Sequence, residues 1–247
     1  MPMKTSTPEH LPPGVAYTST GNSCTEKYSF IGNGRLNCAN GSASFIGNGA
    51  AHLIDAGTNS SFIGNGALHQ IVCGAHNSFI GSGDCNIIQS FSNNSVIGGG
   101  EQNSIGNATA GSLDAQYSFV GGGFGNTIDT GTTPGTESRL NVISGGSNNL
   151  ICAGACNSAI VGGDGNIMNG QCSTIIGGVG NTVNHNLAAV FGNGITTAAA
   201  GTMHVGNLWL QPGVYNTFVG VAPPFTFPLG TVYVDIAGGA NLMRVQG

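Results

Sequence analysis

Acidic side chains are the first candidates for chemistry in this sequence, because a pair of carboxylates can cleave a glycosidic bond. The ten Asp and Glu residues are scattered among 247 positions without an obvious pair. Two long segments, residues 104–117 and 127–140, contain the charged residues Asp114, Asp129, Glu137 and Arg139. These four residues are candidates for a binding surface, although two tolerated surface insertions are the favoured interpretation. We therefore expect no catalytic residues and no enzymatic activity.

His52 and His69 are the candidates for metal binding. They occupy equivalent places in adjacent copies of a sequence repeat, so their rings should stack about 5 Å apart, near enough to share a metal ion. In a threefold assembly the pair could also line an axial site. We favour the alternative, in which each histidine replaces an asparagine in a ladder of stacked side chains. The prediction is no metal site and no cofactor.

The seven cysteines include no CxxC pair. Cys156 and Cys172 fall at nearly equivalent places in neighbouring repeats, so a disulfide between them is one interpretation. We favour the other, in which most of the cysteines are buried thiols that act as small apolar residues.

The composition excludes several classes of function. Only 6% of the residues are charged, the net charge is −5, and there are five Lys and Arg residues. We expect no nucleic-acid partner, because neutralising the phosphates of a nucleic acid requires a basic surface. Membrane insertion is not expected, since no stretch of about 18 apolar residues exists. The 44 glycines disfavour helices.

A repeat organises most of the chain. Its core is a four-residue segment that resembles Ser-Phe-Ile-Gly and begins at Ser29, Ser44, Ser61, Ser78, Ser95, Ser118, Asn141, Ser158, Ser173 and Ala188. A second recurring position lies eight residues after the first residue of each of the first nine core segments. It is occupied by Asn37, His52, His69, Asn86, Asn103, Asn126, Asn149, Asn166 and Asn181. Each repeat therefore reads as a short strand, a glycine-rich corner, a second strand and a corner of variable length.

This pattern predicts an all-β fold, a parallel β-solenoid of about ten to eleven turns that stack at about 4.8 Å. Glycine suits the corners, because tight bends require positive φ. Stacked Asn86, Asn103 and Asn126 should hydrogen-bond to one another along a ladder.

Neighbouring side chains on a strand point to opposite faces. We expect the isoleucines of the core segments to fill the coil and the phenylalanines to point outward; the ladder residues are Ile46, Ile63, Ile80, Phe45, Phe62 and Phe79. An outward apolar stripe roughly 40 Å long and 10 Å wide would approach or exceed the largest patch that soluble monomers normally expose, about 300–600 Å². We therefore predict an obligate homo-oligomer, in which copies of the chain cover one another's stripes.

The segments NSFIGSG (residues 77–83) and NSVIGGG (residues 94–100), with their GxxNxI continuations, resemble the trimeric left-handed β-roll of YadA-type adhesin heads and the related repeats of viral and phage fibres. The resemblance covers about residues 29–207 and implies a left-handed β-roll and a homotrimer. The sequence shows no secretory signal, heptad stalk or membrane-anchoring strands, and these differences from the adhesins favour a fibre on a virus particle.

Three domains are expected. Residues 1–28 read as an extended, proline-containing arm that attaches to a capsid or base protein, residues 29–207 as the solenoid, and residues 208–247 as a β-rich cap or knob. Within the last segment, residues 231–235 and 242–245 predict a β-hairpin. Trp209 and Tyr215 are candidate binding residues there.

The expected function is that of a structural fibre or spike on the virion surface. It would mediate host attachment through multivalent binding to a surface glycan or receptor. One alternative is the head domain of a trimeric adhesin on a bacterial cell surface. A second alternative is a glycan-cleaving tailspike.

Overall fold

The structure is a computed structural model that describes residues 21–106, 115–129 and 138–206, together with the backbone of three further strands. The chain divides into two compact units, residues 1–207 and 208–247. All regular structure in the described residues is β. Within these residues there is consequently no helix that could span a membrane.

The first unit consists of two parallel sheets whose strands alternate along the chain. The larger sheet, sheet A, contains β1 (Val15–Ala16), β3 (Phe30–Ile31), β5 (Phe45–Ile46), β7 (Phe62–Ile63), β9 (Phe79–Ile80), β11 (Val96–Ile97), β13 (Phe119–Val120), β15 (Val142–Ile143), β17 (Ala159–Ile160), β19 (Thr174–Ile175), β21 (Ala189–Phe191) and β22 (Met203–Val205). The smaller sheet, sheet B, contains β2 (Ser23–Cys24), β4 (Cys38–Ala39), β6 (Leu53–Ile54), β8 (Gln70–Ile71), β10 (Ile87–Ile88), β12 (Ser104–Ile105), β14 (Thr127–Ile128), β16 (Leu150–Ile151), β18 (Ile167–Met168) and β20 (Thr182–Val183).

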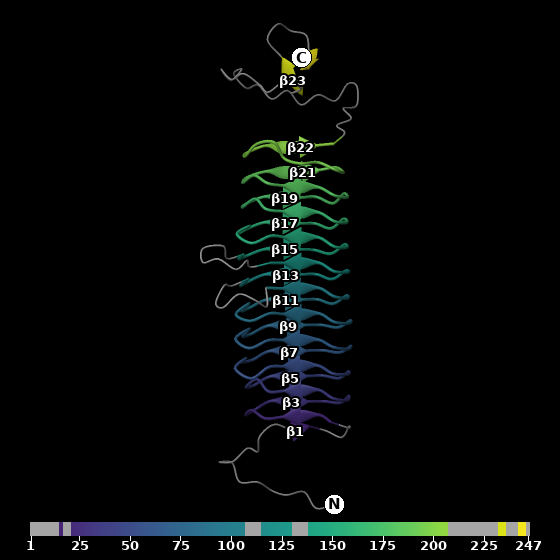
Figure 1. Ribbon diagram of the computed structural model, residues 1–247, viewed down its shortest axis with the longest axis vertical. Helices are drawn as coiled ribbons and strands as arrows, with labels where there is room; N and C mark the ends of the chain where they lie inside the picture. Colours follow the sequence, from purple (N-terminus) through teal and green to yellow (C-terminus); the bar gives the residue numbers. More distant parts are fainter. Residues whose placement is uncertain are drawn as a thin grey trace, which may run out of the picture. The chain divides into compact units, whose positions relative to one another are not determined.

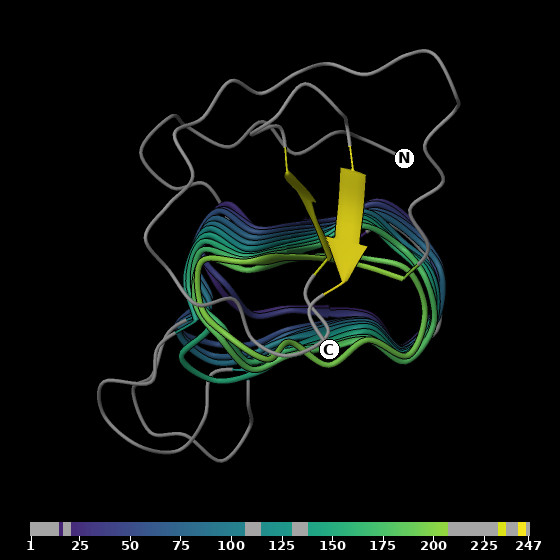
Figure 2. The same ribbon diagram turned by 90° about the horizontal axis from the view of Figure 1, so that it is seen from above.

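The chain alternates between the sheets as far as β21, so each turn but the last contributes one strand to each sheet. Equivalent residues of successive repeats are paired in register, for example Phe45 with Phe62 and Ile46 with Ile63. The strands therefore stand one above another along the first unit (Figure 1). Viewed along the axis, the turns superpose as a flattened loop with two long sides (Figure 2). This confirms the predicted parallel β-solenoid, with about ten turns.

The interior of the solenoid is built from aliphatic side chains of both sheets. Ile46, Ile63 and Ile80 of sheet A and Ile54 and Ile71 of sheet B have no exposed surface. Burying a side chain of this size stabilises the fold by about 1.5–3 kcal/mol, and the same contact recurs on every turn. The predicted inward direction of the sheet A isoleucines is confirmed.

A ladder of buried amides lines the corner that precedes sheet B. Asn86, Asn103 and Asn126 have no exposed surface. The Asn86 Oδ1 accepts the backbone N–H of Asn103 (2.9 Å) and its side-chain Nδ2–H (3.1 Å). Asn103 Nδ2 also donates to the carbonyl oxygens of Gly99 and Gly123, each at 3.0 Å. The predicted asparagine ladder is therefore confirmed, and it satisfies polar groups that a buried corner would otherwise leave unpaired.

The corners need positive φ in more places than glycine alone supplies. Gly49 has φ +114°, and a Cβ there would collide with the backbone of Gly66 in the next turn. Each strand from β2 to β22 is also preceded, two residues earlier, by a residue with positive φ, and many of these are not glycine: Leu36 has φ 57° and Leu68 φ 57°. This conformation costs about 1–2 kcal/mol for an L-residue. A backbone hydrogen bond to the preceding turn offsets part of that cost, as from Leu68 N–H to the Ala50 carbonyl oxygen (2.9 Å).

The parallel pairing begins inside the segment predicted as an arm, because β1 pairs with β3 and β2 with β4. In the second unit, β23 (Val232–Asp235) and β24 (Leu242–Val245) form an antiparallel pair, as the predicted hairpin requires. Trp209 and Tyr215 lie outside the described residues, as do residues 1–14 of the predicted arm.

Candidate functional site

The outer face of sheet A carries a column of aromatic side chains. Phe30, Phe45, Phe62 and Phe79 stack ring on ring, with centroids 5.2, 5.1 and 5.1 Å apart and interplanar angles of 15°, 7° and 5°. The stacking follows from the register, because each phenylalanine is paired with the phenylalanine of the next turn. The predicted outward direction of Phe45, Phe62 and Phe79 is confirmed.

Each of these rings lies over the glycine that directly follows its own strand. A Cβ added to Gly47 would lie 3.5 Å from Cε1 of the Phe45 ring, and one added to Gly81 would lie 3.4 Å from that of Phe79. A larger residue in place of either glycine would also meet the backbone of the next turn. A phenylalanine at the first outward position therefore requires a glycine at the second.

In the last three copies of the Ser-Phe-Ile-Gly segment the sizes of the two outward side chains are reversed: the second position is small and the fourth is large. Val161, Ile176 and Phe191 stand where the earlier turns have glycine, and Ala159, Thr174 and Ala189 stand where they have phenylalanine. Successive turns thus keep a bulky apolar group on this face. We call the resulting column the outer stripe: Phe30, Phe45, Phe62, Phe79, Val96, Phe119, Val142, Val161, Ile176 and Phe191.

The outer stripe is accessible. Phe79 is 38% exposed, Phe119 40% and Phe191 52%, so no part of the chain that the structure describes covers them. In the stacked part, the ring faces contact one another and the ring edges face outward. The stripe is suited to packing against another apolar surface, and less suited to stacking on a sugar, which uses the face of an aromatic ring.

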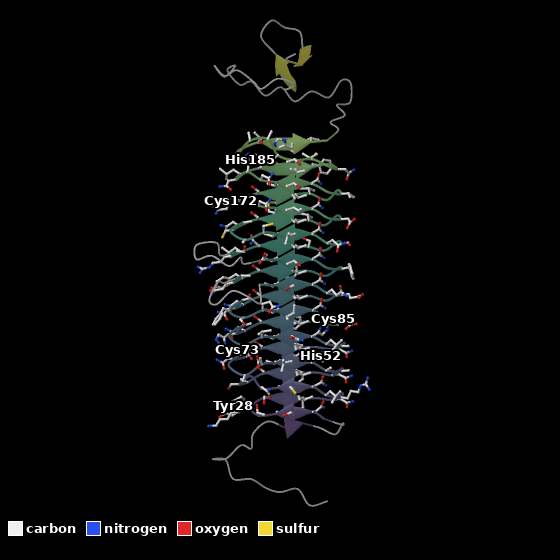
Figure 3. All side chains as sticks on the ribbon, viewed as in Figure 1. Tyr28, His52, Cys73, Cys85, Cys172 and His185 are labelled. Carbon is white, nitrogen blue, oxygen red and sulfur yellow. The ribbon has the colours of Figure 1, made fainter. Side chains whose placement is uncertain are left out.

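His52 and His69 belong to the asparagine ladder. Their rings are stacked with centroids 4.9 Å apart, and both are buried. The Nδ1 atom of each accepts a backbone N–H of the next turn: His52 accepts from His69 (3.2 Å) and His69 from Asn86 (3.2 Å). Each histidine Nδ1 thus accepts a backbone N–H from the next turn, as Asn86 Oδ1 accepts the N–H of Asn103. Figure 3 shows the position of His52. The favoured interpretation, histidine in place of asparagine, is confirmed.

Burial and, to a smaller extent, the neighbouring His69 together lower the pKa of His52 to about 4. Burial also lowers the pKa of His69. Because each Nδ1 lone pair is used by a backbone N–H, neither atom is available to a metal ion. Among the described residues there is no cluster of three or more histidine, cysteine or acidic side chains that could bind one.

The two long corners are described only at their ends. Asp129 and Arg139 lie within the described residues, whereas Asp114 and Glu137 lie outside them. Ser104 is paired with Thr127, and Leu140 N–H donates to the Gln116 carbonyl oxygen (3.1 Å). The two insertions therefore leave and rejoin the coil at the same corner of neighbouring turns.

A pair of acidic residues is present that sequence reasoning missed. Asp84 and Glu101 are bridge partners in adjacent turns, and both are exposed. The sequence could have predicted this pair, because Asp84 lies four residues after the inward Ile80 and Glu101 four residues after the inward Ile97. The Cys85 thiol donates to Asp84 Oδ1 (3.3 Å). This hydrogen bond raises the pKa of Cys85, and burial and the charges of Asp84 and Glu101 contribute further.

The prediction for the cysteines was wrong. None of the seven is fully buried, and Cys73 and Cys172 are exposed. None forms a disulfide, including Cys156 and Cys172, although Cys172 N–H donates to the Cys156 carbonyl oxygen (2.9 Å). The reason is their position: Cys73 and Cys172 lie at the corner that precedes sheet A, and Cys85 lies at the opposite corner (Figure 3). At these three corner positions the side chains are exposed or half-buried, because the inward positions of the corner before sheet B are taken by the asparagine and histidine ladder.

These features define a repeat protein with the architecture of a β-helix, a parallel β-solenoid with repeats of mostly 15 or 17 residues. No protein-family model matches the chain, and no curated protein matches it either. The resemblance to YadA-type heads and viral fibres therefore rests on the repeat motif and on the solenoid that it forms.

Proposed function

We propose that this protein is a structural fibre or spike, in which copies of the chain associate through the outer stripe and together present binding surfaces to a host. The outer stripe is the observation that carries the proposal. Ten turns spaced by about 4.8 Å make it about 43 Å long from the first to the last. Soluble monomers rarely expose a contiguous apolar patch larger than about 300–600 Å².

A second copy of the chain is the simplest cover for the outer stripe, because it offers the same length, spacing and apolar character. The edges of the stacked rings and the apolar residue that each turn adds to the outer stripe suit contact between identical columns. We propose a left-handed homotrimer, since the repeat motif resembles that of trimeric β-rolls. Closed symmetry would bury every stripe and leave the outer face of sheet B and the corners accessible.

Attachment is the role that such an assembly serves best. Three copies present three identical surfaces, so weak contacts with a host glycan or receptor add through avidity. We propose that residues 1–28 anchor the fibre to a capsid or base protein of a virus particle. Residues 208–247 are proposed as a cap or knob, with Trp209 and Tyr215 as contacts. The long corners, with Asp129 and Arg139 at their described ends, are a second candidate surface.

The mass of the full-length protein in solution tests the association. Light scattering after gel filtration should give three times the mass of one chain. Phe62→Ser should raise the dissociation constant at least tenfold, because burial of a phenylalanine contributes about 1.5–3 kcal/mol and 1.4 kcal/mol is a factor of ten. Gln70→Ser, on the exposed outer face of sheet B, is the matched control and should leave the mass unchanged. A monomeric wild-type protein would refute the proposal.

The location is tested separately. Antibody labels on both termini should appear on virus particles in electron micrographs. Labels on bacterial cells would instead support the first alternative, the head domain of a trimeric surface adhesin, which the same geometry would serve.

The exposed pair Asp84 and Glu101 is the observation that keeps a glycan-cleaving tailspike as a second candidate. Hydrolases of this kind use two carboxylates, one of which has a raised pKa in a water-poor site. Two exposed carboxylates on a corner differ from that arrangement, so we rank this candidate lower and expect no cleavage. Incubation with host-surface polysaccharides and measurement of new reducing ends decides between them. Activity in the wild type that Asp84→Asn abolishes would establish the tailspike function.

A further inference from the structure

Three consecutive turns carry the same Gly-Asn-Gly sequence at the corner between sheet A and sheet B. Their asparagines are Asn33, Asn48 and Asn65. The three turns are in register, because Asn33 N–H donates to the Gly47 carbonyl oxygen (3.1 Å) and Asn48 N–H to that of Gly64 (2.9 Å). The side chains thus form a column on one corner of the solenoid.

These asparagines are free to react. All three side chains are exposed, and none of them has a hydrogen-bond partner among the described residues. The glycines that follow, Gly34 and Gly49, likewise donate their N–H to no acceptor in the described part of the chain. The nucleophilic nitrogen and the side-chain carbonyl carbon are therefore both unrestrained by hydrogen bonds.

Two other Asn-Gly pairs provide an internal contrast. Asn169 Nδ2 donates to Asn184 Oδ1 (2.8 Å), and Gly170 N–H donates to the Val183 carbonyl oxygen (3.1 Å). Asn193 Oδ1 accepts the Val179 N–H (2.8 Å), and Gly194 N–H donates to the Val179 carbonyl oxygen (2.8 Å). Both reacting groups are held in each pair.

We propose that Asn33, Asn48 and Asn65 form a site of spontaneous deamidation and isomerisation. The backbone nitrogen of the following glycine attacks Cγ of the asparagine, a C–N bond forms, the Cγ–Nδ2 bond breaks, and ammonia leaves with the proton of the attacking nitrogen. Water then opens the succinimide to aspartate or isoaspartate. No oxidant, reductant or enzyme is required.

Modification would act on the fold at its N-terminal turns. The Asn33 carbonyl oxygen accepts Nδ2–H of Asn37 (3.2 Å), and the Asn65 carbonyl oxygen is 3.1 Å from His69 Nε2. Isoaspartate adds a methylene to the backbone at this point and displaces the oxygen from its ladder partner. Each event also adds one negative charge, so complete modification would change the net charge from −5 to −8, because −5 − 3 = −8.

Mass spectrometry of the aged full-length protein tests the proposal. The protein is incubated in mildly alkaline buffer and digested with chymotrypsin, since it has few lysines and arginines. The exchange of side-chain NH₂ for OH is then followed at each Asn-Gly pair. Asn33, Asn48 and Asn65 should react at least roughly tenfold faster than Asn169 and Asn193, because the latter must first break two hydrogen bonds.

Two controls make the outcome decisive. In denaturant these five pairs and the sixth Asn-Gly pair of the sequence, Asn40-Gly41, should all react at similar rates, which separates local structure from sequence. Asn48→Ser should remove one site without loss of the fold, because Ser82 holds the equivalent place in a later turn. Equal rates at the corner column and at Asn169 and Asn193 in the native protein would overturn the proposal, as would a column that reacts only in denaturant.

Discussion

Acid should weaken the solenoid through its two stacked histidines. His52 and His69 are replaced together by asparagine, the residue that occupies the same position in seven other turns. In the wild type each imidazole is neutral and accepts a backbone N–H through Nδ1. Protonation of Nδ1 removes that acceptor and places charge in a buried ladder.

The size of the effect follows from the pKa of His52, which is about 4 in the folded protein against an ordinary 6.5. A folded-state pKa below the unfolded value means that the unfolded chain binds protons first. The stability is therefore full above about pH 6.5 and falls as the pH drops toward 4, by at most about 3 kcal/mol for His52. About 1.5 kcal/mol of this loss falls between about pH 6.5 and 5, before most carboxylates titrate.

Equilibrium unfolding in urea at about pH 6.5 and 5 measures the difference. The wild type should lose about 1.5 kcal/mol over this interval, and the double asparagine variant should lose much less. Asn86→His, which adds an imidazole at the next rung, should increase the acid sensitivity. If the double variant and the wild type lost the same free energy, the ladder role of the histidines would be wrong.

Four further substitutions test the interior and the corners by thermal or urea unfolding. Ile63→Ala should cost about 2–5 kcal/mol, because it leaves a cavity in a column with no exposed surface; a cost below about 1 kcal/mol would contradict close packing. Gly66→Ala should be strongly destabilising, since its Cβ would meet the backbone of the next turn, whereas Gly145→Ala, with no atom within 4 Å of its Cβ, should be tolerated. Asn103→Ala should cost at least about 1–3 kcal/mol, because it leaves the Asn126 N–H without its partner, and an unchanged stability would show that the ladder contributes little.

The sequence predicted the architecture well because the signal was repeated. One copy of Ser-Phe-Ile-Gly says little, but ten copies at similar spacing require equivalent residues to share an environment. The inward isoleucines, the outward phenylalanines and the asparagine ladder followed from this. The pairing that begins at β1 was not predicted, since Val15–Ala16 lies before the first recognisable copy.

The candidate sites were harder to predict, because corners carry no alternation of apolar and polar residues. Asp84 and Glu101 were read as scattered, although their offset from the core segment makes them neighbours. The cysteines were assigned to the interior by residue type, but the corners that hold Cys73 and Cys172 project outward.

The period, the alternation of inward and outward residues and the need for glycine-rich corners were determined by the sequence alone, because each depends on residue type and spacing within a single repeat. Which residues outside that pattern become neighbours was decided by the tertiary structure. Stacking turns in register brings residues 15–23 positions apart into contact, and it does so for the corners as well as the strands. Asn169 is held by a hydrogen bond to the next turn, whereas the Asn48 side chain has no hydrogen bond within the described residues. Both are followed by glycine, so the difference comes from the neighbouring turn, which only the tertiary structure brings into contact.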